Sequence, residues 1–137
     1  MTVDDIIERH REREGPLLEI LADVQAELGC IDEESVRRIA ATLNLSRAEV
    51  HGVVSFYHDF RPERDDRPVI RLCRAEACQA QGVEGWAESL IEAAGARVRV
   101  ETVYCLGLCS AGPAAMAAGR PVARLDRDSA MALLGQL

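Results

Sequence analysis

Apolar side chains recur at helical spacing through the first part of the chain. One stripe consists of Leu17, Leu18, Leu21, Val24 and Leu28. A second stripe consists of Val36, Ile39, Ala40 and Leu43. Positions three and four residues apart fall on one face of a helix, so each stripe predicts an amphipathic helix. A highly charged segment over residues 3–13 predicts a further short helix.

Polar residues mark where these helices begin. Asp32 is the predicted N-cap of the second stripe, because its carboxylate can accept a hydrogen bond from a free N–H group of the first turn. Ser46 and Glu49 have the spacing of a capping box, which predicts another helix that ends near residues 58–60. Residues 1–60 are therefore expected to form a small helical bundle.

The pattern changes after residues 61–68, RPERDDRP, a polar and proline-flanked segment that we expect to be a linker. Two strands are expected beyond it. One is the apolar run over residues 69–72, and the other is the alternating segment over residues 97–103, which is typical of a half-buried strand. Helical spacing over residues 83–94 predicts a helix between the two strands.

The last part of the chain predicts a hairpin and a closing helix. Gly119-Arg120-Pro121 is a turn signal between two apolar segments, and Asp126 is placed to cap a helix. The order strand, helix, strand, hairpin, helix predicts a compact domain with a mixed sheet over residues 69–137. The fold class expected for the whole chain is α+β, a helical bundle followed by a mixed four-stranded sheet.

Composition and charge exclude several functions for this chain of 137 residues. A formal charge of −7 opposes a nucleic-acid partner. All basic residues are arginine, which excludes a Walker-type phosphate loop and a Schiff-base lysine. The N-terminus is charged, and no apolar run approaches membrane-spanning length, so we expect a cytoplasmic protein without membrane insertion. No nucleophile–base set or catalytic carboxylate pair is evident, and no catalysis is expected from this chain alone.

Four of the five cysteines stand in two close pairs. Cys73 and Cys78 bound the motif CRAEAC, and Cys105 and Cys109 bound the motif CLGLC. Both pairs follow predicted strands and are expected in loops rich in small residues, namely Ala75, Ala77, Gly107, Ser110, Ala111 and Gly112. Such residues allow backbone N–H groups to approach the sulfurs of a bound cluster. Paired soft thiolates are suited to zinc, copper(I) or an iron–sulfur cluster.

Spacing alone leaves more than one site open. Zinc ribbons rarely combine an x4 pair with an x3 pair and no x2 pair, although ligand type and number fit zinc. The C-x-x-C motif of thioredoxin-like exchange is absent. Four cysteines at wider spacings are compatible with a [2Fe-2S] cluster, although this arrangement differs from the plant-type one. The residues favour the cluster over a zinc-stapled protein-binding module, with unligated core cysteines as a third alternative.

The two motifs stand behind the helical segment LSRAEVHGVVSFYHDF, and together they resemble the thioredoxin-like [2Fe-2S] ferredoxin subunits. This group includes the small iron–sulfur subunit of complex I, matching subunits of NAD-linked hydrogenases, and the gamma subunit of NAD-dependent formate dehydrogenase. The resemblance runs from Pro16 to the C-terminus and is nearest to the formate dehydrogenase gamma subunit. It implies a helical docking domain over residues 1–60 and a thioredoxin-like ferredoxin domain over residues 69–137. The cluster ligands that it implies are Cys73, Cys78, Cys105 and Cys109.

The resemblance also implies a function. It predicts an electron-transfer subunit with one [2Fe-2S] cluster beside a flavin- and NAD-binding subunit, and through it a formate-oxidising subunit. The alternatives within the group are an NADH:quinone oxidoreductase and an NAD-linked hydrogenase. A homodimer is implied for the isolated chain. Phe56, Tyr57 and Phe60 are candidate docking contacts or bundle core.

The remaining polar and aromatic residues have simpler interpretations. His51 and His58 are expected on a helix surface rather than at a metal, because no third ligand accompanies them. His10 is expected to be solvated and Trp86 to lie in a core. Cys30 departs from the family pattern, and we expect it to pack at a helix end.

Overall fold

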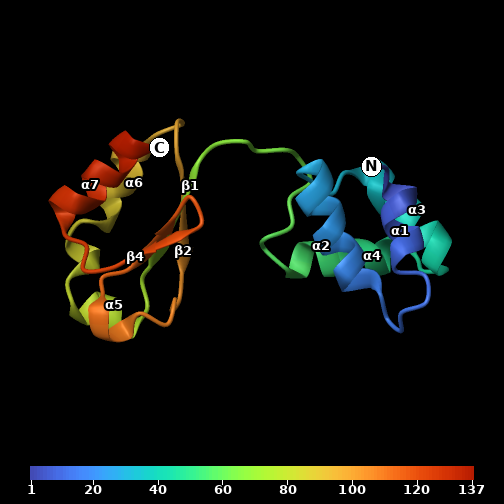
Figure 1. Cartoon of the computed structure of the whole chain (residues 1–137), viewed down its shortest axis with the longest axis horizontal. Coiled ribbons are helices and arrows are strands. Elements are labelled where there is room, and N and C mark those ends of the chain that lie inside the picture. The colour runs from blue at the N-terminus through green and yellow to red at the C-terminus, as the bar shows by residue number, and fades with distance from the viewer. The chain divides into compact units, whose positions relative to one another are not determined.

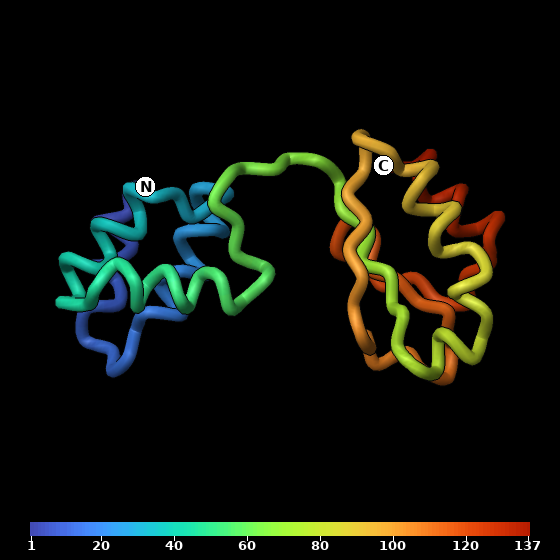
Figure 2. The backbone as a smooth tube through the Cα atoms, turned by 180° about the vertical axis from the view of Figure 1, so that it is seen from behind, coloured from blue at the N-terminus to red at the C-terminus, as the bar shows by residue number.

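The computed structural model describes all residues 1–137, which fold as two compact units, Met1–Asp66 and Arg67–Leu137. Figures 1 and 2 show the helices of the first unit and the sheet with its helices in the second. The first unit contains α1 (Val3–Arg9), α2 (Leu17–Leu28), α3 (Glu33–Leu43) and α4 (Arg47–Phe56). No helix in either unit is long and apolar enough to span a bilayer.

Side-chain caps fix the starts of these helices. The predicted caps are confirmed: the Asp32 carboxylate accepts a hydrogen bond from the Ser35 N–H at 2.8 Å, and Ser46 forms a capping box with Glu49. Two of the predicted ends were too late, because α1 stops at Arg9 and α4 stops at Phe56. The segment that follows α4 folds back onto the unit, where the Arg61 carbonyl accepts a hydrogen bond from Ile31.

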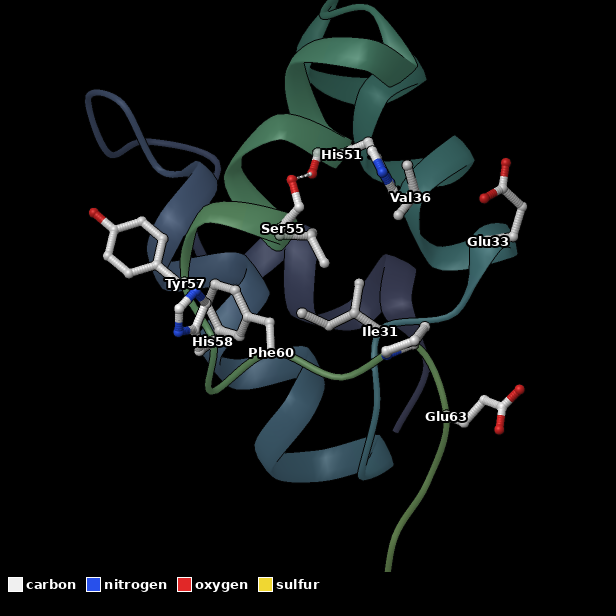
Figure 3. Close-up of a pocket in the computed structure, with 11 residues that line it drawn as sticks. Ile31, Glu33, Val36, His51, Ser55, Tyr57, His58, Phe60 and Glu63 are labelled. Carbon is white, nitrogen blue, oxygen red and sulfur yellow. Dashed lines mark hydrogen bonds between the residues drawn. The ribbon is translucent and has the colours of Figure 1, made fainter. Parts of the chain in front are cut away.

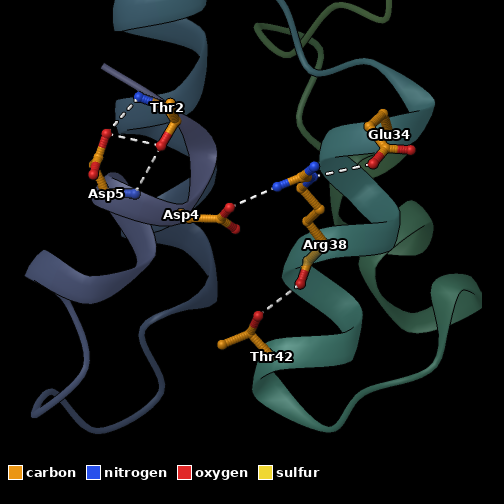
Figure 4. A network of polar contacts seen from close by, with 6 residues as sticks. All are labelled: Thr2, Asp4, Asp5, Glu34, Arg38 and Thr42. Atoms are coloured by element: carbon orange, nitrogen blue, oxygen red, sulfur yellow. Dashed lines mark hydrogen bonds and ion pairs between the residues drawn. The ribbon is translucent and has the colours of Figure 1, made fainter.

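A polar network joins α1 to α3 on the surface of this unit (Figure 4). The Arg38 guanidinium lies 2.6 Å from the Asp4 carboxylate and 3.0 Å from the Glu34 carboxylate.

The apolar faces of the four helices pack into one core. Its completely buried residues include Ile6, Ile20, Leu21, Val24, Ile39 and Val50.

His10 is buried, so the expectation that it is solvated was wrong. Only 7% of the residue is exposed, and its Nε2 lies 2.7 Å from the Asp23 carboxylate. The Glu19 carboxylate faces Nδ1 at 3.4 Å. His10 follows α1, and both carboxylates belong to α2, so the imidazole links these two helices. The hydrogen bond to Asp23 compensates for part of the hydration that the ring loses on burial, whereas Nδ1 is buried without a hydrogen bond.

The second unit is built on a mixed four-stranded sheet, as predicted, with the order β2-β1-β3-β4. Its strands are β1 (Val69–Cys73), β2 (Arg99–Val103), β3 (Ala115–Ala117) and β4 (Arg120–Val122). Its helices are α5 (Glu76–Ala80), η1 (Val83–Gly85), α6 (Ala87–Ala94), η2 (Cys109–Ala111) and α7 (Arg127–Gln136). Strand β1 pairs with β2 in parallel and with β3 antiparallel.

Helices α6 and α7 lie together on one side of this sheet (Figure 1). The core between them contains Ile70 and Leu72 of β1 and also Trp86, which is 8% exposed, as predicted. The alternate residue Arg71 is exposed and lies 3.2 Å from Glu101 of β2. The period of two along β1 therefore separates the buried face from the polar face.

Two local predictions need correction. Cys78 was expected in a loop, but it lies in the short helix α5. The hairpin turn consists of Ala118 and Gly119, with φ of 50° and 75°, and Arg120 already belongs to β4. A two-residue hairpin turn with positive φ at both positions matches the twist of the strands it joins, which places the turn one residue earlier than expected.

Candidate functional site

The parallel pairing of β1 and β2 brings both cysteine motifs to the same edge of the sheet. Cys73 ends β1 and is paired in register with Val103, the last residue of β2. The next residue, Arg74, donates its N–H to the Val103 carbonyl at 2.9 Å. Cys105 follows Val103 by two positions. Parallel strands end at a common edge, so motifs far apart in the sequence meet there.

All four predicted cysteines line one cavity of about 270 Å³ at this edge. The lining residues are Cys73, Ala75, Glu76, Ala77, Cys78, Cys105, Leu106, Leu108, Cys109 and Ala114. The thiols remain in pairs within it. The sulfurs of Cys105 and Cys109 are 3.5 Å apart, and the thiols of Cys73 and Cys78 lie close enough for each to shift the pKa of the other. The four thiols do not converge on a point that would hold a single metal ion.

The two thiol pairs differ in their exposure. Cys73 and Cys78 are each 2% exposed and belong to the core of the unit. Cys105 and Cys109 are exposed, and the neighbouring Tyr104 is 75% exposed. The cavity therefore has a buried wall formed by β1 and α5, and an outer wall formed by the loop that follows β2.

Backbone geometry shapes the outer wall. Cys105 has φ of 94°, an unusual value for a residue with a side chain, and Gly107 has φ of 77°. This turn directs the Gly107 N–H toward the Cys105 sulfur at 3.3 Å. Backbone N–H groups aimed at sulfur are a common feature of iron–sulfur sites.

Gly112 lets the backbone pack closely against the Cys78 sulfur on the buried side of the cavity. A Cβ at this position would lie 2.9 Å from the Cys78 sulfur, although the backbone has an ordinary φ of −75°. The absence of a side chain is therefore needed for close approach rather than for backbone freedom. Gly112 is one of the small residues that accompany the cysteines in the sequence, but no sequence pattern indicates which sulfur it approaches.

Two side chains that hold the walls of the cavity in place were not predicted from the sequence. Gln81 donates through Nε2 to the carbonyls of Ala77 and Cys109, at 3.0 and 2.9 Å, and so joins α5 to η2. Arg74 pairs with Glu84 at 2.6 Å and with Glu88 at 3.4 Å, which holds the end of β1 against η1 and α6. Nothing in the sequence distinguishes these residues from other surface glutamines and arginines.

The thiols ionise in different environments. Burial raises the pKa of Cys73, but the N–H groups of Ala75, Cys105 and Leu106 and the Cys78 thiol together outweigh it, so the pKa is below its usual value. Burial raises the pKa of Cys78, which stays above its usual value. The Cys105 thiol raises the pKa of Cys109. The thiolate is the metal-binding form, and it is favoured at Cys73 over Cys78 and Cys109.

The other candidate residues lie in the helical unit. His51 is exposed on α4, as expected, whereas His58 is exposed in the turn that follows α4 and not on a helix. Phe56 and Tyr57 are exposed, whereas Phe60 is half-buried against the core. Cys30 is half-buried at the end of α2, in the unit without the other cysteines.

Comparison with known proteins gives a consistent result. Residues 3–137 match the model of the thioredoxin-like [2Fe-2S] ferredoxin family. One subunit of the NADH-quinone oxidoreductase of Buchnera aphidicola subsp. Baizongia pistaciae is 27% identical over 121 residues, which cover 82% of this chain and 71% of that subunit. The alpha subunit of the NAD-reducing hydrogenase HoxS of Cupriavidus necator is 32% identical over 95 residues.

The HoxS alpha subunit and the hydrogenase chain of known structure are much longer than this chain. The match to the HoxS subunit covers 69% of this chain but 16% of that subunit. A crystal structure of an NAD⁺-reducing [NiFe]-hydrogenase in the air-oxidised state superimposes with a TM-score of 0.70 and 27% identity, over 88% of this chain and 22% of the hydrogenase chain. The likeness therefore covers most of this chain, but about a fifth of the hydrogenase chain.

Proposed function

This chain belongs to the thioredoxin-like [2Fe-2S] ferredoxin family, and on that basis we propose that it is the electron-transfer subunit of an NAD-dependent redox complex. Four cysteines would hold its cluster: Cys73, Cys78, Cys105 and Cys109. The observation that carries this proposal is the single cavity that all four thiols line. Two pairs of thiols suit a cluster with two irons, because each iron takes two terminal sulfur ligands.

The surroundings of the thiols fit such a cluster. Small residues leave room beside the sulfurs, most clearly at Gly112. The Gly107 N–H points at the Cys105 sulfur, and three backbone N–H groups lower the pKa of Cys73. Donors of this kind favour thiolate over thiol and offset the negative charge of a four-thiolate site. A [2Fe-2S] cluster held there supplies reversible transfer of one electron.

The exposure of one thiol pair supports a role beside a partner subunit. Cys105 and Cys109 lie on the surface, and Tyr104 beside them is 75% exposed. Electron transfer requires a close approach of donor and acceptor, and the exposed wall of the cavity permits it. We propose that a flavin- and NAD-binding subunit covers this wall, while the buried pair fixes the cluster to the core of the domain.

The complex that contains this subunit is proposed from its relatives. Those described above are subunits of an NADH-quinone oxidoreductase and of an NAD-reducing hydrogenase. They support a complex of one of these two types over the formate dehydrogenase assignment suggested by the sequence motifs. The gamma subunit of a formate dehydrogenase remains a second candidate because of CRAEAC and CLGLC alone.

The cluster is tested on the full chain after anaerobic purification. Iron and acid-labile sulfide are counted, and EPR spectra are recorded at low temperature before and after reduction with dithionite. We expect two irons and two sulfides per chain, and an S = 1/2 signal that appears on reduction. A colourless protein with one zinc and no signal after anaerobic reconstitution would refute the proposal and favour the zinc-stapled module.

The complex is tested separately in the native cells. A tagged copy of the chain is purified with its partners, which are identified by mass spectrometry, and dye reduction is measured with NADH, hydrogen and formate. Co-purification with a formate-oxidising subunit and formate-dependent activity would favour the second candidate. NADH-dependent activity alone would favour an NADH dehydrogenase, and hydrogen-dependent activity would favour a hydrogenase.

A further inference from the structure

The net negative charge of the chain comes from its helical unit. Met1–Asp66 contains 16 Asp and Glu residues and eight Arg residues, a formal charge of −8. Arg67–Leu137 contains seven Asp and Glu residues and eight Arg residues, a formal charge of +1. A concentrated negative surface attracts basic partner surfaces and accelerates their association. The helical unit is therefore suited to a positively charged partner.

A groove of about 560 Å³ opens on this unit (Figure 3). It lies between the start of α3, the second half of α4 and the segment over residues 57–63. Its floor is apolar and consists of Ile31, Val36 and Val54, of which at most 8% is exposed. A floor of this kind can accept an apolar side chain from another protein.

The two ends of the groove differ in character. Figure 3 shows Tyr57, His58 and Phe60 together at one end, and Glu33 and Glu63 toward the other. The acidic end adds to the negative charge of the whole unit. The groove therefore offers an aromatic contact and a carboxylate contact to the same bound segment.

The wall of the groove is held in place by backbone hydrogen bonds. The Ile31 N–H donates to the Arg61 carbonyl at 2.7 Å, and the Arg61 N–H donates to the Gln25 side chain at 2.7 Å. The segment after α4 is thus fixed to α2 and to the loop before α3. A preformed groove loses less conformational entropy when it binds a partner.

Aromatic rings stand exposed beside the groove. Phe56 is 74% exposed and Tyr57 is 42% exposed, and their rings meet edge to face with centroids 5.0 Å apart. Exposed apolar surface next to a groove marks an interaction site, and aromatic side chains often carry most of the binding energy at such sites.

We propose that this groove binds a basic segment of the flavin- and NAD-binding partner subunit. One apolar side chain of that segment packs on the floor at Val54, and an Arg or Lys lies beside Glu63, because Glu33 is already paired with Arg47 at 3.3 Å. The inference rests on the proposed function, because it takes the chain to be a subunit of such a complex. The charge of the helical unit selects a basic segment over an acidic one.

The test uses calorimetry at two salt concentrations to measure how the full, cluster-loaded chain binds its purified flavin- and NAD-binding partner. Glu63→Arg reverses a charge at the acidic end, and we expect at least tenfold weaker binding with a smaller salt dependence. Glu27→Arg makes the same charge change at an exposed position of α2 outside the groove. This control should bind within twofold of the unmodified chain.

A second pair of variants tests whether the groove must be open for the partner to bind. Ser55 lines the groove from α4 and is exposed, so Ser55→Trp fills the groove without disturbing the core. We expect Ser55→Trp to weaken binding at least tenfold and Ser55→Ala to leave it unchanged. Wild-type binding by both Glu63→Arg and Ser55→Trp would overturn the proposal.

Two further results separate the groove from the proposed function. If the variants keep partner binding but lose self-association in sedimentation experiments, the groove accepts a second copy of the chain and the proposal is wrong. If the unmodified chain shows the reduced-cluster EPR signal but does not bind the flavin subunit, the proposed partner of the groove is wrong, whereas the proposed cluster is supported. If the unmodified chain shows no cluster signal, the proposed function itself fails.

Discussion

A Cβ placed on Gly112 would lie 2.9 Å from the sulfur of Cys78. Carbon and sulfur atoms do not pack this closely, so any side chain at position 112 must displace the thiol, the Gln81 side chain beside it, or both. The position combines an ordinary backbone conformation with a requirement for glycine, and that requirement comes from the cavity.

Gly112→Ala should therefore damage the site more than the fold. We expect a loss of about 1–3 kcal/mol in the free energy of unfolding of the second unit, typical of overpacking. We also expect less than half of the wild-type iron content after reconstitution, because the Cys78 sulfur is displaced. The control is Gly135→Ala, which adds a methyl group in open space on α7. It should bind iron normally, and full iron content in Gly112→Ala would contradict the prediction.

Four of the five cysteines should be needed for cluster binding, and Cys30 should not. Cys73→Ala removes a buried thiol from the cavity, and we expect the EPR signal of the reduced cluster to be lost or strongly altered. Cys30→Ser changes the half-buried cysteine of the helical unit and should leave iron, sulfide and the EPR signal at wild-type levels. Loss of the cluster in Cys30→Ser, or two irons in Cys73→Ala, would show that the ligand set is different.

Asp32→Ala should destabilise the helical unit in a pH-dependent way. The Ser35 side chain and N–H hold the pKa of Asp32 below its usual value of 3.8. The pKa of Asp32 is therefore lower in the folded state than in the unfolded state. The cap stabilises α3 fully above about pH 4, and this stabilisation is lost as the pH falls through the folded-state pKa of Asp32. Loss of an N-cap costs about 1 kcal/mol at neutral pH.

Hydrogen exchange of the α3 amides at pH 7 and in acid measures this effect. The difference between wild type and Asp32→Ala should shrink toward zero in acid. Asp32→Asn keeps a capping oxygen and should retain most of the stability at pH 7. A difference of equal size at both pH values would mean that the carboxylate charge has no part in the cap.

His10→Ala should destabilise the helical unit by about 2 kcal/mol, because a hydrogen bond to a charged partner contributes roughly 1.5–3 kcal/mol. The buried ring joins α1 to Asp23 of α2, and alanine leaves α1 without this link. Urea unfolding followed by far-UV circular dichroism measures the change. His58→Ala removes an exposed histidine and should shift the stability by less than about 0.5 kcal/mol. Equal effects of the two variants would indicate that His10 is not a structural link.

The sequence predicted those features that depend on neighbouring residues. The caps at Asp32, Ser46 and Asp126 follow from local hydrogen bonds, and all three are present. Strand β1 was predicted because an apolar run ends at Cys73. Its pairing with β2 places the two cysteine motifs together, and this could be expected only from the fold that the family resemblance implied.

Features that depend on distant residues were missed or wrong. His10 is buried because two carboxylates of α2 face it, and no local pattern predicts that contact. Helix α5 has five residues, too few for a periodic pattern, and its burial of Cys78 depends on the sheet. The contact of Gln81 with the Cys109 carbonyl joins positions 28 residues apart.

The sulfurs of Cys105 and Cys109 lie exposed and 3.5 Å apart, which gives the order of events during maturation a particular importance. A disulfide requires them to approach to about 2.05 Å, a small movement for two residues of one surface loop. In an oxidising solution this pair can therefore close to a disulfide, with an external oxidant taking up the two electrons. If the four thiols hold the proposed cluster, insertion of that cluster competes with this oxidation, and the yield of cluster-loaded protein depends on which reaction is faster.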